Sequence, residues 1–206
     1  MIEVNQDPKD RMAGPAKYFK NEILEVFNEY LTEIPAPIID LFEATYWIWY
    51  FTNFEKWQEI QGIVAAVDNK DLSMSKAVLV NALYEIEAWC TSIIAKQSDG
   101  SIIHARNLDF ENPNGMRKVT YRATFVKDGE YLYDAVMFAG NCGVYTGIKS
   151  GAYSISENER FPETDPKGAI ENLFLMFYGV QEISWLIRKT LEHCPDYDCA
   201  YKNLRQ

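Results

Sequence analysis

The stretch that decides the fold is CTSIIAKQSDGSIIHARNLDF, residues 90–110. Two strand-like runs rich in isoleucine lie on either side of the turn signal SDG, which is the pattern of a β-hairpin. Asp-Gly is a favoured dipeptide in two-residue hairpin turns. The sequence therefore predicts two antiparallel strands that turn at Asp99 and Gly100.

This turn fixes which residues face each other across the hairpin. It pairs Cys90 with Asp109 and Ile93 with Arg106. Because paired residues lie about 4.5–5.5 Å apart at Cβ, we expect the carboxylate within hydrogen-bond reach of the thiol. Arg106 falls on the other face, and it joins the site only if a bulge or a twisted strand end turns it.

A thiol, a cation and a carboxylate at one end of a hairpin suggest a cysteine nucleophile. A nearby cation such as Arg106 favours the reactive thiolate of Cys90. If the chain were cut between Trp89 and Cys90, the new α-amine would act as general base for its own side chain, and Asp109 would orient it. The alternative is structural: Cys90 is a buried apolar residue, and Arg106 and Asp109 form an ordinary ion pair.

Residues 1–89 are expected to be mostly helical. Apolar residues recur at helical spacing in residues 16–31. A second helix is expected over residues 38–54, where apolar side chains occur nearly all round. A third is expected over residues 71–89, with Ser73 as a candidate N-cap.

From residue 90 the chain becomes β-rich. Turn signals separate the strand-like runs CTSIIAK, SIIHARNLDF, KVTYRATFVKDG and YLYDAVMFAG. They predict a meander of at least four antiparallel strands, and GVYTGIKSGAYSISENER has room for two more. The pattern becomes helical again from Pro166. The order predicts an α+β fold with a helical segment over residues 1–89 and a second unit over residues 90–206.

Composition excludes several classes of function. The chain has 206 residues, 48% of them hydrophobic, which indicates a packed core. A net charge of −10 argues against nucleic acid as a partner. The four cysteines form no C-x-x-C pair and the two histidines lie far apart, so we expect no metal and no cofactor. Cys194 and Cys199 flank PDYD, and the sequence leaves open whether they form a small disulfide or stay free thiols.

The motifs C-T-S and H-x-R-N-x-D, at residues 90–92 and 104–109, carry a family resemblance. With the surrounding VNALYEIEAW and the later FAGNCGVYTGIKSGAYSISENER, they resemble acid ceramidase and N-acylethanolamine acid amidase. The start IEVNQDPKDR and the stretch EISWLIRKTLEHCPDYDCAYKNL are similar to further parts of that family, so the resemblance spans nearly the whole chain. These enzymes are N-terminal nucleophile cysteine amidohydrolases, related in fold to the bile-salt hydrolases.

The resemblance implies a mechanism and a set of site residues. Family members cut themselves before the cysteine, here the Trp89–Cys90 bond, and hydrolyse fatty-acyl amides through a thioester. Cys90 would be nucleophile and base, and Arg106 and Asp109 would position the α-amine and the substrate. Glu159 matches a further active-site carboxylate, and its alternative is a surface charge at a strand end.

The resemblance also gives a function to the apolar stretch PIIDLFEATYWIWYF, residues 37–51. It is too short, and with Asp40 and Glu43 too charged, to span a membrane. Apolar helices of this family help the enzyme to contact lipid, so Trp47 and Trp49 are expected at a membrane interface. The alternative is packing against the sheet.

Two departures from the family pattern leave a second reading open. The family's large subunit continues with further strands and a T-N-Y-D motif, whose asparagine serves the oxyanion, so the αββα-type fold is expected to be incomplete. The family is lysosomal and glycosylated, whereas this chain shows neither a signal peptide nor an N-x-[ST] acceptor, so its compartment stays open. Either the chain is part of a longer product that supplies the missing segment, or it is a shortened relative that no longer catalyses. The alternative to a lipid amidase is then an inactive relative that serves as a structural or lipid-binding subunit of an assembly. A general penicillin- or bile-salt-type amidase is a third alternative.

Overall fold

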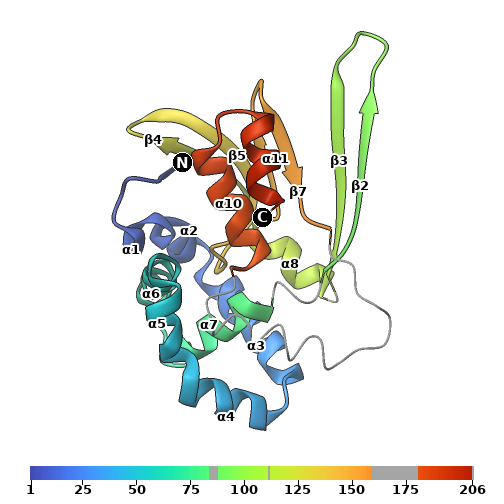
Figure 1. The fold of residues 1–206 in the computed structure, drawn as a ribbon. Coiled ribbons are helices and arrows are strands. Elements are labelled where there is room, and N and C mark those ends of the chain that lie inside the picture. Colours follow the sequence, from blue (N-terminus) through green and yellow to red (C-terminus); the bar gives the residue numbers. More distant parts are fainter. Residues whose placement is uncertain (84–87, 111, 159–180, 206) are drawn as a thin grey trace.

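The structure is a computed structural model that describes residues 1–83, 88–110, 112–158 and 181–205. Its mixed helices and antiparallel strands confirm the predicted α+β class. Three parts are visible in Figure 1: a group of N-terminal helices, a sheet with two C-terminal helices beside it, and a hairpin that stands apart from the sheet.

The N-terminal segment is helical as predicted, with more breaks. Its elements are α1 Pro8–Arg11, α2 Ala13–Tyr18, α3 Lys20–Glu33, α4 Ala36–Thr45, the 3-10 helix η1 Tyr46–Ile48, α5 Trp49–Thr52, α6 Phe54–Val67 and α7 Met74–Leu83. The helix predicted over residues 16–31 is divided at Phe19, but α3 buries the expected stripe of Ile23, Val26, Phe27 and Tyr30.

The second predicted helix is three elements. After α4 the chain passes through η1 and α5, and Asn53, with φ −137° and ψ 50°, separates α5 from α6. The apolar residues here gave no periodic signal, because side chains on several sides are apolar. The third predicted helix is shorter than expected, since β2 already includes Ala88 and Trp89; its Ser73 does accept a hydrogen bond from the Lys76 amide, at 3.3 Å.

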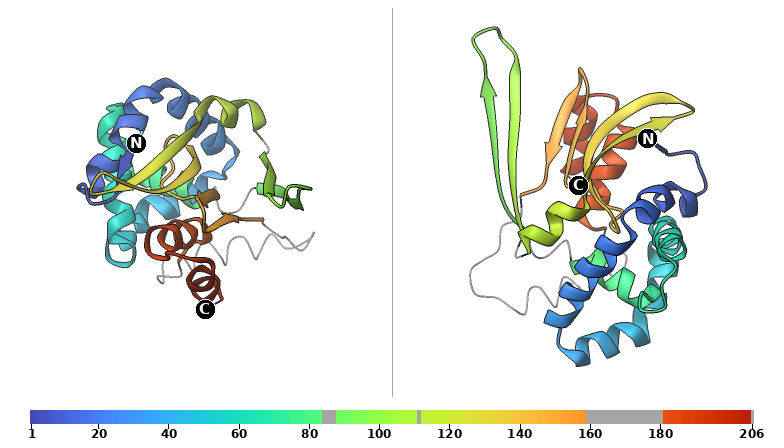
Figure 2. Two further views of the ribbon diagram at one scale, coloured as in Figure 1. Left: turned by 90° about the horizontal axis from the view of Figure 1, so that it is seen from above. Right: turned by 180° about the vertical axis from the view of Figure 1, so that it is seen from behind.

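Two sheets replace the single predicted meander. The five-stranded sheet has the order β1-β4-β5-β6-β7, from β1 Ile2–Glu3, β4 Thr120–Lys127, β5 Glu130–Phe138, β6 Thr146–Lys149 and β7 Tyr153–Ser156. The hairpin of β2 Ala88–Lys96 and β3 Ile102–Phe110 is a separate two-stranded sheet. Figure 2 shows the gap between the two ribbons from behind.

A short helix separates the hairpin from the rest. The sequence ENPNG is expected to form a turn, but Pro113, Asn114 and Gly115 are the first three residues of α8 Pro113–Val119. Asn112 caps this helix by accepting from the Gly115 amide at 2.9 Å, and proline at the first helical position suits a helix start. Helix α8 contacts both β3 and α3, so it redirects the chain between the two sheets.

The hairpin register differs from the prediction by one residue. Cys90 pairs with Leu108, and Arg106 pairs with Ser92. The turn is longer than two residues: the Gln97 amide donates to Ser101 O at 2.8 Å, and Gly100 has φ +87°. A three-residue loop closed by a left-handed glycine is the next commonest hairpin connection. A shift of one residue moves each side chain of a strand to the other face relative to its partner strand.

One hydrophobic core joins both halves of the chain. It draws on the N-terminal helices, on β4 and β5, and on α10 Ile183–His193, which packs on the sheet beside α11 Tyr197–Leu204. The disulfide considered for Cys194 and Cys199 is present between α10 and α11. The division into units at residues 1–89 and 90–206 stays a prediction. In the described residues, no helix is both long and apolar enough to cross a membrane.

Candidate active site

The register places Arg106 beside Cys90. Both side chains lie on one face of the hairpin, because Cys90 and Ser92 are two residues apart in β2 and Arg106 pairs with Ser92. The Nη2 of Arg106 donates to Cys90 Sγ at 3.1 Å. The prediction that Arg106 lies on the opposite face is therefore wrong. It failed because the loop has one more residue than the assumed turn.

The guanidinium of Arg106 is held by residues at and beside strands β6 and β7 of the five-stranded sheet. Its Nη1 donates to the Tyr145 carbonyl and to Thr146 Oγ1, and its Nη2 also donates to the Glu157 carbonyl. The Glu157 amide in turn donates to Tyr145 O at 2.9 Å, which fixes the two carbonyls relative to each other. A planar, always-charged fork suits such multiple acceptors. The cation that contacts the thiol is thus positioned by β6 and the end of β7.

Asp109 lies on the other face of the hairpin. It is exposed, and it accepts two hydrogen bonds from Asn107 Nδ2, at 2.8 and 3.0 Å. Its partner across the strands is Trp89, so the predicted pairing of Asp109 with Cys90 is wrong. Asp109 nevertheless lies opposite Trp89, which precedes Cys90 and forms one side of the peptide bond that is expected to be cut.

Two hollows meet at Arg106, between the hairpin and the five-stranded sheet. The first has a volume of about 640 Å³ and extends along the outer half of β3, past His104 and Ile102, to β6 and β7. The second, of about 400 Å³, extends toward α8 and includes Asp109 and Phe138. Arg106, Val136 and Thr146 line both. The cation therefore lies at the junction of a mostly apolar cleft.

The remaining predicted site residues have different outcomes. Glu159 lies outside the described residues. Trp47 is 53% exposed, so its expected contact with lipid stays a prediction. Trp49 is wholly buried, with Lys56 Nζ 5.3 Å from its ring centre, so an interfacial position for Trp49 is wrong. The two tryptophans lie on different sides of the chain because one belongs to η1 and the other begins α5.

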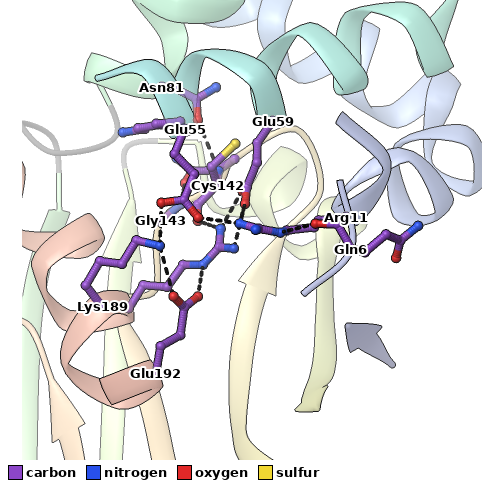
Figure 3. A network of polar contacts seen from close by, with 12 residues as sticks. Gln6, Arg11, Glu55, Glu59, Asn81, Cys142, Gly143, Lys189 and Glu192 are labelled. Atoms are coloured by element: carbon purple, nitrogen blue, oxygen red, sulfur yellow. Dashed lines mark hydrogen bonds and ion pairs between the residues drawn. The ribbon is translucent and has the colours of Figure 1, made fainter. Parts of the chain in front are cut away.

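Sequence reasoning missed a buried network of charges between α6 and α10 (Figure 3). Arg188 of α10 and Glu59 of α6 are fully buried and form two hydrogen bonds, at 2.5 and 2.7 Å. Arg11 contacts both Glu59 and Glu55, and Lys189 contacts Glu55 and Glu192. A signal was present in the sequence, since Arg188 falls among apolar residues in SWLIRKTLEH. Its partner 129 positions away could not be read from it.

The pKa values of Arg188 and Glu55 in this network are shifted toward the charged forms. Burial by itself would lower the pKa of Arg188, but the charges of Glu59 and Glu192 outweigh burial and raise that pKa well above its ordinary value. Burial would raise the pKa of Glu55, but hydrogen bonds and charges from Lys189 and Arg11 lower it to about 2. The pKa shifts of Arg188 and Glu55 thus favour the charged forms of these two residues, and the network joins α6 to α10.

No metal site is found in the part of the chain that the structure describes. Within it, no three side chains of His, Cys, Asp or Glu gather as metal ligands would. The groups that the described part of the site brings together are a thiol and a fixed cation, in a cleft with mostly apolar walls.

Comparison with known proteins gives one group of relatives. The chain is 42% identical to the N-acylethanolamine-hydrolyzing acid amidase of Rattus norvegicus over 147 residues, which are 71% of this chain and 39% of that protein. It is 31% identical to the N-acylethanolamine-hydrolyzing acid amidase of Caenorhabditis elegans, over 95% of this chain and 57% of that protein. It is 30% identical to the acid ceramidase of Bos taurus, over 68% of this chain and 38% of that protein.

These relatives are longer than the chain, which spans 39% of the rat protein and 57% of the worm protein. Among solved structures, a Caenorhabditis elegans N-acylethanolamine-hydrolyzing acid amidase ortholog is similar, with 35% sequence identity and a TM-score of 0.48 over 55% of this chain and 47% of that chain. No family model matches the chain.

Proposed function

This chain belongs to the family of the N-acylethanolamine-hydrolyzing acid amidases and acid ceramidases, and from this premise we propose that it hydrolyses the amide bond of fatty-acyl amides through Cys90. The observation that carries the proposal is the contact of Arg106 Nη2 with Cys90 Sγ, at 3.1 Å. A cation at this distance favours the thiolate, which is the nucleophilic form.

The reaction begins with self-cleavage at the Trp89–Cys90 bond, which gives Cys90 an α-amine. This amine takes the thiol proton, and the sulfur attacks the amide carbonyl carbon of the lipid. The C–N bond then breaks, the ammonium returns the proton to the leaving amine, and a thioester remains. Water attacks the thioester, the C–S bond breaks, and a fatty acid is released.

Asp109 has a separate part in this scheme. Because it lies opposite Trp89 in the ladder rather than opposite Cys90, its carboxylate acts on the junction and on the amine formed there. This division leaves Arg106 as the charge next to the sulfur. We retain Glu159 as a further active-site carboxylate on the family resemblance alone.

An exposed aromatic surface supports a lipid substrate. Trp47, Tyr50, Phe51 and Phe54 are exposed, and ring contacts at 5.1 to 6.2 Å connect them. Aromatic side chains with polar edges suit the interface between water and lipid. We propose that this aromatic surface brings the protein to a membrane or micelle that holds the substrate.

The alternative is a non-catalytic subunit, structural or lipid-binding, that acts in an assembly. The exposed aromatic surface of Trp47, Tyr50, Phe51 and Phe54 would serve a lipid-binding subunit as well as it would serve an amidase.

Intact mass and hydrolysis separate the two functions. Purified protein is analysed by mass spectrometry before and after incubation in acid, and then tested with an N-acylethanolamine and with ceramide. The amidase predicts two fragments split at Trp89–Cys90 and hydrolysis of one substrate, both lost in Cys90→Ala but kept in Cys142→Ala, which removes the buried thiol. A single uncut chain with no hydrolysis in any condition would favour the non-catalytic subunit.

A further inference from the structure

We propose that His104 is a positioning residue for the Cys90–Arg106 pair: its imidazole, through Ser156, fixes the hairpin against β7 where Arg106 reaches the sulfur. The inference deepens the proposed function and rests on it. His104 belongs to the same motif as Arg106, yet the proposed reaction gives it no part.

His104 points toward β7 from the site face of the hairpin. It lies two residues before Arg106 in β3, so the two side chains share one face. Its Nδ1 is 2.8 Å from Ser154 Oγ, and its Nε2 is 3.1 Å from Ser156 Oγ. The ring therefore spans alternate residues of β7, both of which face the hairpin.

Counting hydrogens determines which ring nitrogen donates. Ser92 Oγ donates its one hydrogen to Asn158 Oδ1, at 2.9 Å, so its contact with Ser156 Oγ at 2.8 Å must use the hydrogen of Ser156. Ser156 then has none left for His104 and accepts from its Nε2. The geometry thus assigns the hydrogen to Nε2, while Nδ1 accepts from Ser154 when the ring is neutral and donates to it when the ring is charged.

These contacts lie next to Arg106 both in the hairpin and in the five-stranded sheet. Ser92 is the cross-strand partner of Arg106, and Ser156 precedes Glu157, whose carbonyl accepts from the guanidinium. A change in the distance between the hairpin and β7 would therefore move Arg106 relative to its acceptors and to the sulfur. Shifts of about 1 Å at a reacting group can lower a rate by about 10²-fold.

The hairpin needs such support because backbone pairing does not supply it. In the described ranges, β2 and β3 form no ladder with the five-stranded sheet. Among the contacts of the described residues, the side chains of Ser92, His104 and Arg106 provide polar links to it. A two-stranded hairpin is at best marginally stable alone, so these links hold the nucleophile in place.

Two amide variants distinguish the ring nitrogens. The side-chain amide of His104→Gln reaches the position of Nε2 and can donate to Ser156, whereas that of His104→Asn reaches only the position of Nδ1. Ser156→Ala removes the link, and Ser154→Ala is the matched control that removes only the other contact. All four are compared with the unchanged protein.

The readout is the alkylation rate of Cys90 by iodoacetamide, measured by mass spectrometry on the intact chain from about pH 5 to about pH 9, where thiolates form. The other thiols do not interfere: burial raises the pKa of Cys142 well above its ordinary value, and Cys194 and Cys199 form a disulfide. Rates are compared between chains in the same cleavage state, which the same spectra report.

We expect His104→Gln and Ser154→Ala to keep the alkylation rate. His104→Asn and Ser156→Ala are expected to slow alkylation several-fold, because Arg106 would move away from the sulfur. Equal behaviour of the Gln and Asn variants, whether both unchanged or both impaired, would overturn the proposal. Absence of amide hydrolysis in the unchanged protein would sink the proposed function but not this result, because alkylation needs no substrate.

Discussion

At the scale of single residues, the site depends on one contact between a cation and a sulfur. Arg106 donates to Cys90 and to acceptors on the five-stranded sheet. It therefore places a positive charge next to the sulfur and fixes the hairpin relative to the sheet. The sequence identified both residues by type and motif. It did not show that they share a face, because the face depends on the length of the turn.

Replacing Arg106 tests this contact. We expect Arg106→Met to slow alkylation of Cys90 and self-cleavage by about ten- to a hundredfold, since a hydrogen bond to a charged group contributes about 1.5–3 kcal/mol. Arg106→Lys keeps the charge but loses the planar fork, so it should recover only part of the rate. Exposed Arg122→Met is the control. A normal rate in Arg106→Met would show that the thiol does not depend on this cation.

At the scale of elements, the hairpin loop decides the composition of the site. Gly100 takes a left-handed conformation that other residues adopt with strain. The loop it closes adds the residue that brings Arg106, rather than Asp109, to the thiol. A prediction based on the dipeptide alone chose the commoner two-residue turn, and the error reversed both faces of the strand.

Shortening the loop should leave the register unchanged. Deletion of Ser98 leaves Asp99-Gly100 as a two-residue turn between Gln97 and Ser101, which already pair in the structure. Arg106 should then stay opposite Ser92 and next to Cys90, and alkylation of Cys90 should proceed about as fast as in the unchanged protein. Replacement of Ser98 by alanine keeps the loop length and is the control. Alkylation slowed as in Arg106→Met, together with NMR contacts that show a shifted pairing across the strands, would contradict this prediction.

The aromatic surface makes a prediction of its own. The double variant Trp47→Ser, Phe51→Ser removes two exposed rings and should weaken binding to vesicles of neutral phospholipid, because each ring buries apolar area in the interface. Tyr18→Ser is the matched control, since Tyr18 is 82% exposed and lies on α2, away from this surface. Co-sedimentation measures the effect. Equal loss in the control would show that the contact with lipid is not localised.

At the scale of the whole molecule, the buried charges connect the two sides of the expected cut. Glu59 precedes residue 90 and Arg188 follows it, so this pair would join the two products. The arginine also lies over the rings of Trp185 and Phe125, at 4.8 and 5.3 Å. Removing one partner of such a pair leaves an uncompensated buried charge.

Glu59→Gln is therefore expected to lower the free energy of unfolding by about 3–5 kcal/mol. Its control, Glu25→Gln, breaks the exposed pair with Lys118 and should cost about 0–1 kcal/mol. Urea unfolding followed by circular dichroism measures both. Equal, small effects would show that the buried pair contributes no more than a surface one.

The network also predicts how stability depends on pH. Because the folded pKa of Glu55 is lowered from 4.5 to about 2, its contribution is fully present above about pH 4.5 and is lost as pH falls toward 2. The difference in unfolding free energy between the unchanged protein and Glu55→Gln should thus be constant above that range and shrink below it. A difference that grows in acid would contradict the assignment. Because the Glu55 side chain is 38% exposed, solvent screening keeps its contribution to the free energy of unfolding modest.

The sequence by itself determined the α+β class and the succession of helices and strands, and its motif indicated which residues to consider for the candidate site. Periodicity and turn residues are local, and the motif around Cys90 is read directly from the chain. Tertiary structure decided the rest: the one-residue register that joins Arg106 to the sulfur, the separation of the hairpin from the sheet, the burial of Trp49 and the pairing of Glu59 with Arg188. Each depends on contacts between residues far apart in the chain or on one loop glycine, and neither leaves a periodic signal in the sequence.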